Sequence, residues 1–276
     1  MKRALLLALI VFLLSCMILI SRSRSVNASS SDFTYLEMLS GSMHPTLEIG
    51  DLLVVDGNVN KSQMDAAPYP EGDIIAFQAY GEVIVSRAIE RIVDNGSVYY
   101  ITQGDDNAAP GPGSPTPAES IIGKIVAFSR NFSCGTWNNQ AYNVTFLTNS
   151  SLANFNFNQP QKEVTLDITG YMSHADQGFC NLTIPKSLLS CDSLTSWQVL
   201  LNSTHIPYEA NQNDTDTFVY FTYGYNNSSI QIIGQQAVPE FPSLVILPSF
   251  IITTLLAVIV YRGKNTKQRV QRSNPR

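Results

Sequence analysis

The sequence predicts a mainly β protein whose strands lie between two membrane-spanning helices. Three observations lead to this fold class. Between residues 32 and 238, short runs of aliphatic, aromatic and β-branched residues alternate with turn-forming residues, as in antiparallel sheets. Two long apolar blocks without any charge lie near the ends of the chain. Only 14% of the 276 residues are charged, whereas ordinary soluble domains have about 25%.

Composition also excludes several classes of protein. Acidic residues outnumber basic ones by 22 to 17, for a net charge of −5, whereas a nucleic-acid-binding protein needs a basic face. Four cysteines are too few for a scaffold built on disulfides. The three histidines are scattered and show no ligand spacing with the cysteines, so we expect neither a metal nor a cofactor.

The first apolar block runs from Ala4 to Ile20, 17 residues without a charge. At about 1.5 Å per residue, a helix of this length just crosses a bilayer. A cleaved signal peptide is the alternative, because Lys2 and Arg3 precede the block. However, the apolar run exceeds the ~7–15 residues usual in signal peptides. We therefore expect residues 1–24 to form a cytoplasmic start and an uncleaved membrane helix.

The second apolar block runs from Leu244 to Tyr261, and six basic residues follow it. Pro248 lies near its start, which membrane helices tolerate. Because basic residues flank both blocks on their outer sides, the positive-inside rule places both termini in the cytoplasm. Residues from about 25 to 240 then lie outside. We expect a two-helix protein of the cell membrane, with the lipid bilayer as a partner.

Glycosylation sequons support this orientation. Eleven Asn-x-Ser/Thr triplets occur, more than the composition would give by chance, which is typical of a surface that carries sugars. The alternative is simple richness in Asn, Ser and Thr at turns. The sequon asparagines are Asn27, Asn60, Asn95, Asn131, Asn143, Asn149, Asn181, Asn202, Asn213, Asn226 and Asn227.

The first part of the outer region, residues 30–128, reads as short strands. Residues 94–97, Asp-Asn-Gly-Ser, are a hairpin turn signal. The proline-rich segment 108–117 reads as a loop. The predicted strands are residues 51–56, 73–77, 82–85, 88–89, 92–93, 98–102 and 121–128.

The second part, residues 130–238, is rich in Asn, Ser, Thr and aromatic residues. Its strand signals recur about every 12–20 residues, which indicates a small β-sandwich. An oxidising exterior permits a disulfide among Cys134, Cys180 and Cys191. The last two are the closest pair in sequence, but spacing leaves the connectivity open. The predicted strands are residues 144–147, 163–168, 179–184, 197–201, 218–223 and 230–233.

One motif points to chemistry. Ser42 stands between Gly41 and a Met-His-Pro segment, so a tight turn can expose its hydroxyl beside backbone N–H groups suited to an oxyanion hole. Most Ser-Gly-Ser segments are ordinary turns. Further pieces follow in order, however: Gly50-Asp51, then Ser86-Arg87 within a β-like run, then the Gly-Asp-Asp-Asn segment 104–107 and Gly123-Lys124.

Together these motifs resemble the type I signal peptidase family in its archaeal and endoplasmic-reticulum form. The resemblance covers about residues 30–128, and it implies a signal-peptidase-type β-fold anchored in the membrane. It implies a serine endopeptidase, a hydrolase that cuts preproteins at the outer membrane face after small residues. By this resemblance Ser42 is the nucleophile, Asp105 the acidic partner, and Ser86 stands at the position of the family's general base. Preproteins and the protein-export machinery are the implied partners.

The base position departs from the family, which has lysine or histidine there. Because a serine hydroxyl has no useful proton affinity near neutral pH, Ser86 cannot act as a general base. Asp106 stands where the family usually has Asn or Ala. Gly111 stands near the place where the family often has a further aspartate.

Several other groups are candidates for the base. His44 lies two residues from Ser42, which allows one bridging water but disfavours a direct bond in an extended segment. His174 and His205 belong to the second part and could act only through packing of the two parts. A carboxylate, Asp105 or Asp106, matches a serine poorly unless burial raises its pKa. Arg87, Arg91 and Lys124 are given no chemical role.

Three functions therefore stay open. The first is a signal-peptidase-type endopeptidase, favoured because the serine motif is complete. The second is a catalytically impaired homologue that binds signal peptides. The third is a structural protein of the cell surface, favoured by the sequons and by the tail, residues 239–276. That tail begins with Pro-Glu-Phe-Pro and resembles the PEF-type sorting signals of archaeal surface proteins; a stop-transfer anchor is the alternative.

Overall fold

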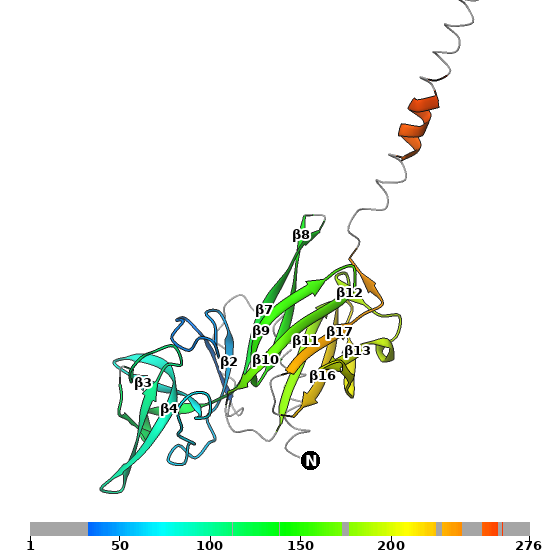
Figure 1. Ribbon diagram of the computed structural model, residues 1–276. Helices are drawn as coiled ribbons and strands as arrows, with labels where there is room; N and C mark the ends of the chain where they lie inside the picture. The colour runs from blue at the N-terminus through cyan, green and yellow to red at the C-terminus, as the bar shows by residue number, and fades with distance from the viewer. Residues whose placement is uncertain are drawn as a thin grey trace, which may run out of the picture.

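The computed structural model describes residues 33–111, 113–137, 139–172, 177–224, 228–238, 250–258 and 261. In this part of the chain the protein is mainly β, and all its paired strands are antiparallel. This confirms the predicted secondary-structure class. Figure 1 shows two β-rich parts side by side, the first coloured blue to cyan and the second green to orange.

The first part holds six strands that flank the strand β7. The sheet runs β7-β3-β4-β5-β6, and β2 pairs with β7 and with β1. One strand, β4, spans the three short runs expected from sequence. At its turn into β5, Asn95 and Gly96 have φ of 48° and 85°, which suits the predicted Asn-Gly hairpin. The strands are β1 (Phe33–Glu37), β2 (Leu52–Asp56), β3 (Ile74–Ala79), β4 (Glu82–Asp94), β5 (Ser97–Gln103) and β6 (Thr116–Pro117).

The strand β7 (Ile121–Trp137) joins the two parts without a linker. Its first half pairs with β2 and β3, and its second half pairs with β8 (Gln140–Thr148). A short 3-10 helix, η2 (Ala118–Ser120), leads into it. The boundary expected at residues 128–130 therefore falls inside one continuous strand.

The second part is built from two sheets. One is the β7-β8-β11-β16-β15 end of the large sheet, and the other has the order β14-β13-β17-β10-β9. Two short strands, β12 and β18, pair with each other. The remaining elements are β9 (Ser150–Asn158), β10 (Glu163–Tyr171), β11 (Gly178–Pro185), β12 (Leu189–Ser190), η3 (Leu194–Ser196), β13 (Gln198–Leu201), β14 (Thr204–His205), β15 (Tyr208–Gln212), β16 (Asp216–Tyr223), β17 (Ser228–Ile233) and β18 (Gln236–Ala237).

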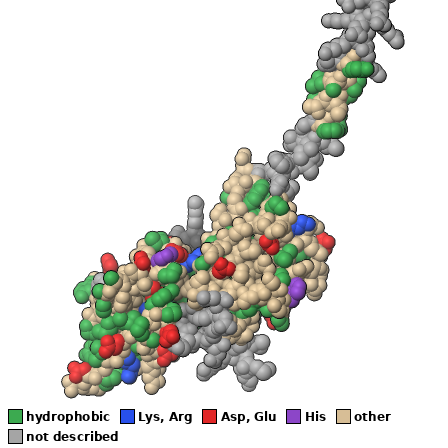
Figure 2. Space-filling view, in the orientation of Figure 1, with side chains coloured by type: hydrophobic (Ala, Val, Ile, Leu, Met, Phe, Trp, Pro, Cys, Tyr) green, Lys and Arg blue, Asp and Glu red, His purple; other side chains and the backbone are tan. Residues whose placement is uncertain are grey.

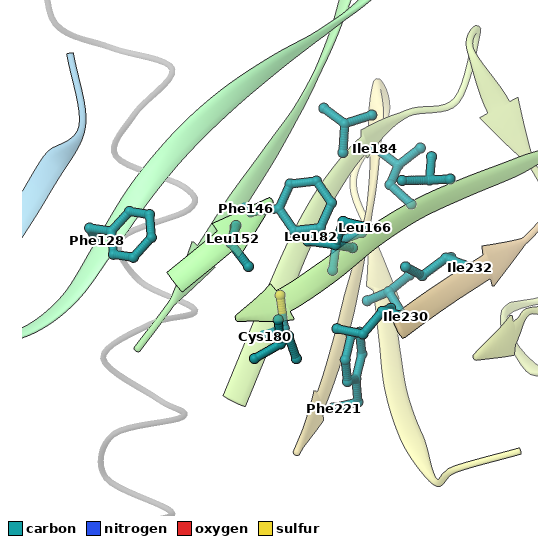
Figure 3. Close-up of a cluster of buried hydrophobic side chains, with 14 of the residues drawn as sticks. Phe128, Phe146, Leu152, Leu166, Cys180, Leu182, Ile184, Phe221, Ile230 and Ile232 are labelled. Carbon is teal, nitrogen blue, oxygen red and sulfur yellow. The ribbon is translucent and has the colours of Figure 1, made fainter. Parts of the chain in front are cut away.

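A single buried cluster fills the space between these two sheets. Phe146 and Leu182 enter it from one sheet, and Leu166, Ile230 and Ile232 enter it from the other, all at most 1% exposed (Figure 3). Burial of each such side chain stabilises the fold by about 1.5–3 kcal/mol. The same cluster extends through Phe128 to Met43 and Leu47 of the first part, so the two parts share apolar packing.

The two membrane-spanning helices expected from the sequence are not confirmed by the structure. Within the described residues, no helix is both long and apolar enough to cross a membrane. Residues 250–258 are helical, while the first apolar block lies outside the described part of the chain. The two membrane helices thus stay predictions.

The cysteines do not form the disulfide that the sequence permitted. Cys134, Cys180 and Cys191 are all free thiols in the described chain. Cys180 is fully buried among the apolar side chains of the sandwich (Figure 3). Its sulfur packs in the core like a small apolar group.

Candidate active site

Ser42 lies in a closed loop, residues 38–51, between β1 and β2. Two bonds close its neck: the Met38 amide donates to the Asp51 carbonyl at 2.9 Å, and the Gly50 amide donates to the Met38 carbonyl at 2.8 Å. Gly50 has φ of +89°, a conformation in which other residues are strained. Met43 and Leu47 are fully buried. These two side chains therefore anchor the loop to the interior of the protein.

The loop packs against the Gly104–Asn107 segment through Ser42 itself. The Ser42 carbonyl accepts a hydrogen bond of 3.0 Å from the amide of Asp106. A side chain at Gly104 would place its Cβ 2.5 Å from the same carbonyl oxygen, so only glycine permits this approach. The Ser42 side chain is half-buried, and its hydroxyl lies 3.1 Å from the Ser40 hydroxyl. Backbone packing thus fixes the serine while its side chain stays accessible.

Asp105 joins three segments of the first part. Its carboxylate accepts a bidentate pair from Arg87, at 2.7 Å from Nε and 2.6 Å from Nη2. The Thr46 hydroxyl donates to the same carboxylate at 2.5 Å. Thr46 lies four residues after Ser42, and Arg87 follows Ser86 directly. The acidic residue therefore ties the serine loop to β4.

Arg87 is fully buried, and its hydrogen bonds explain how a charge is kept there. The guanidinium has five N–H donors. Two bonds go to Asp105, one to Thr46 and two to the carbonyls of Pro70 and Gly72. The Tyr69 ring lies 5.5 Å from its central carbon. Since Arg87 and Thr46 occupy the Asp105 carboxylate, its direct contacts are with them; in the described chain it makes no hydrogen bond to the hydroxyl of Ser42 or Ser86.

Ser86 lies on β4 directly opposite Ile75 of β3 and is 4% exposed. Because residues opposite each other on paired strands share a face, Ser86 and Ile75 point to the same side of the sheet. Because successive residues of a strand alternate, the Arg87 side chain points to the other side. The structure records no hydrogen bond of the Ser86 hydroxyl to any described residue. The Ser86 side chain therefore lies on the face of the sheet that also carries Ala88, Ile75 and, opposite Ile75 on β7, Lys124.

Two other basic groups lie near this arrangement, and each has an acidic partner. His44 Nδ1 is 2.8 Å from Glu48 Oε1, on the exposed surface of the serine loop, which leaves Nε2 directed elsewhere. Lys124 on β7 also lies opposite Ile75, and its Nζ is 2.6 Å from Asp73 Oδ1.

Of the other candidates for the general base, the structure describes His205 and Asp106. His205 lies exposed on β14, in the other sheet of the second part. His174 lies outside the described residues. Asp106 is exposed and meets Ser42 only through its backbone amide. In the described chain, no three side chains gather as metal ligands.

Comparison with known proteins gives one informative relative. Signal peptidase I W of Bacillus subtilis (strain 168) is 27% identical to this chain over 120 residues. The chain is similar to a type I signal peptidase. The match covers 43% of this chain and 60% of the relative, so the chain spans less than two thirds of that protein's length. No family model matches the chain. The similarity supports a relationship to signal peptidases, and hence to serine-endopeptidase hydrolases, at the level of the family.

Exposed apolar side chains are concentrated in the first part of the molecule. Leu39 and Ile49, at the two ends of the serine loop, are 79% and 67% exposed. In the described chain, all the large exposed hydrophobic side chains outside residues 250–261 lie between residues 35 and 93. Figure 2 shows hydrophobic surface gathered over this part of the molecule, at the lower left. Two of these exposed apolar side chains, Leu39 and Ile49, therefore belong to the loop that carries Ser42.

The sequence did not single out Thr46, Asp51 or Arg130, although all three hold the serine loop. Thr46 follows the Met-His-Pro segment directly, so its place in the motif was the available signal. Asp51 was noted only as part of a Gly-Asp pair. Arg130 lies far along the chain from the loop and carries no sequence signal of its role.

Proposed function

We propose that this protein is a membrane-bound serine endopeptidase of the signal peptidase I type, which removes signal peptides from exported preproteins. The observation that carries the proposal is the bond between the Asp106 amide and the Ser42 carbonyl, which unites the serine loop with the Gly104–Asn107 segment. The similarity to a signal peptidase supports the same reaction class.

In this mechanism the Ser42 hydroxyl attacks the scissile carbonyl, and the turn around it supplies backbone donors for the oxyanion. Asp105 acts by positioning: it holds Thr46 and Arg87, and through them the serine loop and β4. Ser86 occupies the family's base position without replacing the base. His44, oriented by Glu48 through Nδ1, would then take the serine proton through a water.

The setting follows from the same proposal. The exposed Leu39 and Ile49 of the serine loop would contact an extended apolar segment beside the bilayer. Both termini would be cytoplasmic, the site would face outward, and the export machinery would deliver preproteins. The sequons and the PEF-like tail support a glycosylated archaeal cell-surface protein.

A second function is favoured by one observation. Ser86 is buried and makes no hydrogen bond within the described chain, so nothing at the base position serves Ser42. A homologue with an intact scaffold and no base would bind signal peptides without cutting them.

The test is cleavage of a preprotein with an Ala-x-Ala site by the full chain reconstituted in lipid vesicles. Wild type, Ser42→Ala and Ser86→His are compared, with the exposed Ser187→Ala as a matched control. Cleavage by wild type that disappears in Ser42→Ala supports the endopeptidase. No cleavage by wild type, together with activity in Ser86→His, supports the binding protein instead. Cleavage that persists in Ser42→Ala contradicts the proposed nucleophile.

A further inference from the structure

A second buried ion pair holds the serine loop, at its neck. Arg130 Nε donates to Asp51 Oδ1 at 2.8 Å, and Nη2 donates to Oδ2 at 2.6 Å. The two side chains are 9% and 1% exposed. This bidentate geometry fixes direction as well as distance. Asp51 is thus held in one orientation by a residue far along the chain.

Arg130 belongs to the second part of the molecule by its contacts. It lies opposite Phe146 of β8, just beyond the last residue of β7 that pairs with β2. Its Nη1 donates to the Leu152 carbonyl of β9 at 3.3 Å. The rings of Phe128 and Phe132 lie 4.9 and 6.0 Å from its central carbon. The sandwich therefore positions this guanidinium.

Asp51 in turn holds the serine loop through hydrogen bonds to its two ends. Its Oδ2 accepts the Glu48 amide at 2.8 Å, and its own amide donates to the Glu48 carbonyl at 3.1 Å. Its carbonyl accepts the Met38 amide at 2.9 Å. Both the start and the end of the serine loop therefore meet at this one residue.

We propose that Arg130 is a positioning residue through which the β-sandwich holds the Ser42 loop in place. The catalytic part of the inference rests on the function proposed above; the mechanical part does not. The sandwich becomes an internal support of the site. With Arg130–Asp51 at the neck and Arg87–Asp105 against β4, two carboxylates clamp the loop from two sides.

Substitution of Arg130 by Lys keeps the charge but loses the planar fork that bonds both oxygens. The expected result is a loop that opens more often. Displacement of a nucleophile by about 1 Å can cost about 100-fold in rate, so kcat should fall at least tenfold while KM changes much less.

The experiment measures amide hydrogen exchange and cleavage on the full chain in detergent. Arg130→Lys and Asp51→Asn are compared with wild type and with Arg91→Lys, an exposed arginine whose side chain donates to the Ser62 carbonyl. Exchange at residues 39–50 should rise at least tenfold in both loop variants, while amides of β11 and β16 stay as protected as in wild type.

Unchanged exchange at residues 39–50 would overturn the inference. So would equal loss of protection in β11 and β16, because that result means a merely structural role. If Arg130→Lys fails to fold, the hydrogen exchange of Asp51→Asn at residues 39–50 and in β11 and β16 decides instead. If wild type does not cleave, the proposed function fails, and the exchange result still decides whether the sandwich supports the loop.

Discussion

The amide of Asp106 donates a 3.0 Å hydrogen bond to the carbonyl oxygen of Ser42. The bond fixes the backbone of the serine without engaging its hydroxyl, which lies 3.1 Å from the Ser40 hydroxyl. Together with the Thr46–Asp105 bond of 2.5 Å, it means that the nucleophile candidate is placed by a segment at the end of β5 rather than by its own loop alone.

Gly104→Ala tests this close approach. The new Cβ would lie 2.5 Å from the Ser42 carbonyl oxygen, so the two segments must separate. Overpacking of this kind costs about 1–3 kcal/mol, and we expect cleavage to fall with it. Gly111→Ala is the control in the same loop, since no atom lies within 4 Å of its Cβ position. Thermal unfolding and cleavage rates are measured; equal behaviour of the two variants would contradict the close contact.

Arg87→Met should be strongly destabilising. It leaves the buried Asp105 carboxylate without its bidentate partner, and loss of one member of a buried pair costs about 3–5 kcal/mol. Arg91→Met, on the exposed side of the same strand, should stay within about 0.5 kcal/mol of wild type. Urea unfolding gives both values. A loss below about 1 kcal/mol in Arg87→Met would show that the ion pair contributes little.

The His44–Glu48 pair can be tested through activity. If His44 accepts the serine proton, His44→Gln should lower kcat by about 10²–10⁴-fold, and Glu48→Gln should lower it to a smaller extent by removing the negative charge beside Nδ1. His205→Gln, exposed on β14, is the matched control. Full activity of His44→Gln would exclude His44 as the base.

Alkaline pH should weaken the fold. Burial raises the pKa of Cys134 to about 12, and burial also raises the pKa of Cys180 and Cys191. Folded thiols stay protonated while unfolded ones ionise, so stability is complete below about pH 9 and declines as pH rises toward the folded pKa.

Urea unfolding between pH 8 and 11 measures this decline. Cys134→Ala should decline less steeply than wild type, because one fewer thiol is held protonated by folding. Thr136→Ala, an exposed neighbour on β7, is the control and should follow wild type. Identical slopes for the two variants would speak against a half-buried Cys134 thiol that stays protonated in the fold.

Sugar attachment should discriminate among the sequons. Asn149 is 9% exposed, and its amide bonds the Gln177 carbonyl and the Phe179 amide. Asn181 is 8% exposed on β11. A glycan at either would break the sandwich. If the protein is glycosylated, intact glycopeptide mass spectrometry of native material should find sugars at exposed sequons such as Asn60 and Asn95. Occupancy at Asn149 would contradict the packing.

The sequence located most strands because alternation and turn signals are local. Five of the six strands predicted after residue 130 fall within observed ones, and the sixth, 197–201, starts one residue before β13. It missed β9, whose Asn residues interrupt the apolar pattern, and β15, a polar edge strand. It split β4 into three pieces because two polar pairs interrupt the apolar run: Ser86-Arg87, which is buried, and Glu90-Arg91, which is exposed.

The site was predictable as a set of motifs and not as a set of contacts. Ser42, Ser86 and Asp105 stand in recognisable segments. The Arg130–Asp51 pair could not be read from sequence, because it joins residues whose neighbours carry no shared pattern. Only the path of β7 through both parts brings them together.

That path has a consequence for how the molecule can be divided. The strand β7 is 17 residues long and pairs with strands of both parts. It therefore provides neither a hinge nor a linker at which the chain could be divided. Severed near residue 129, each half would keep an unpaired strand edge, which invites association with other chains. The protein should therefore resist being shortened to its serine-bearing half, and it should unfold in one transition rather than two.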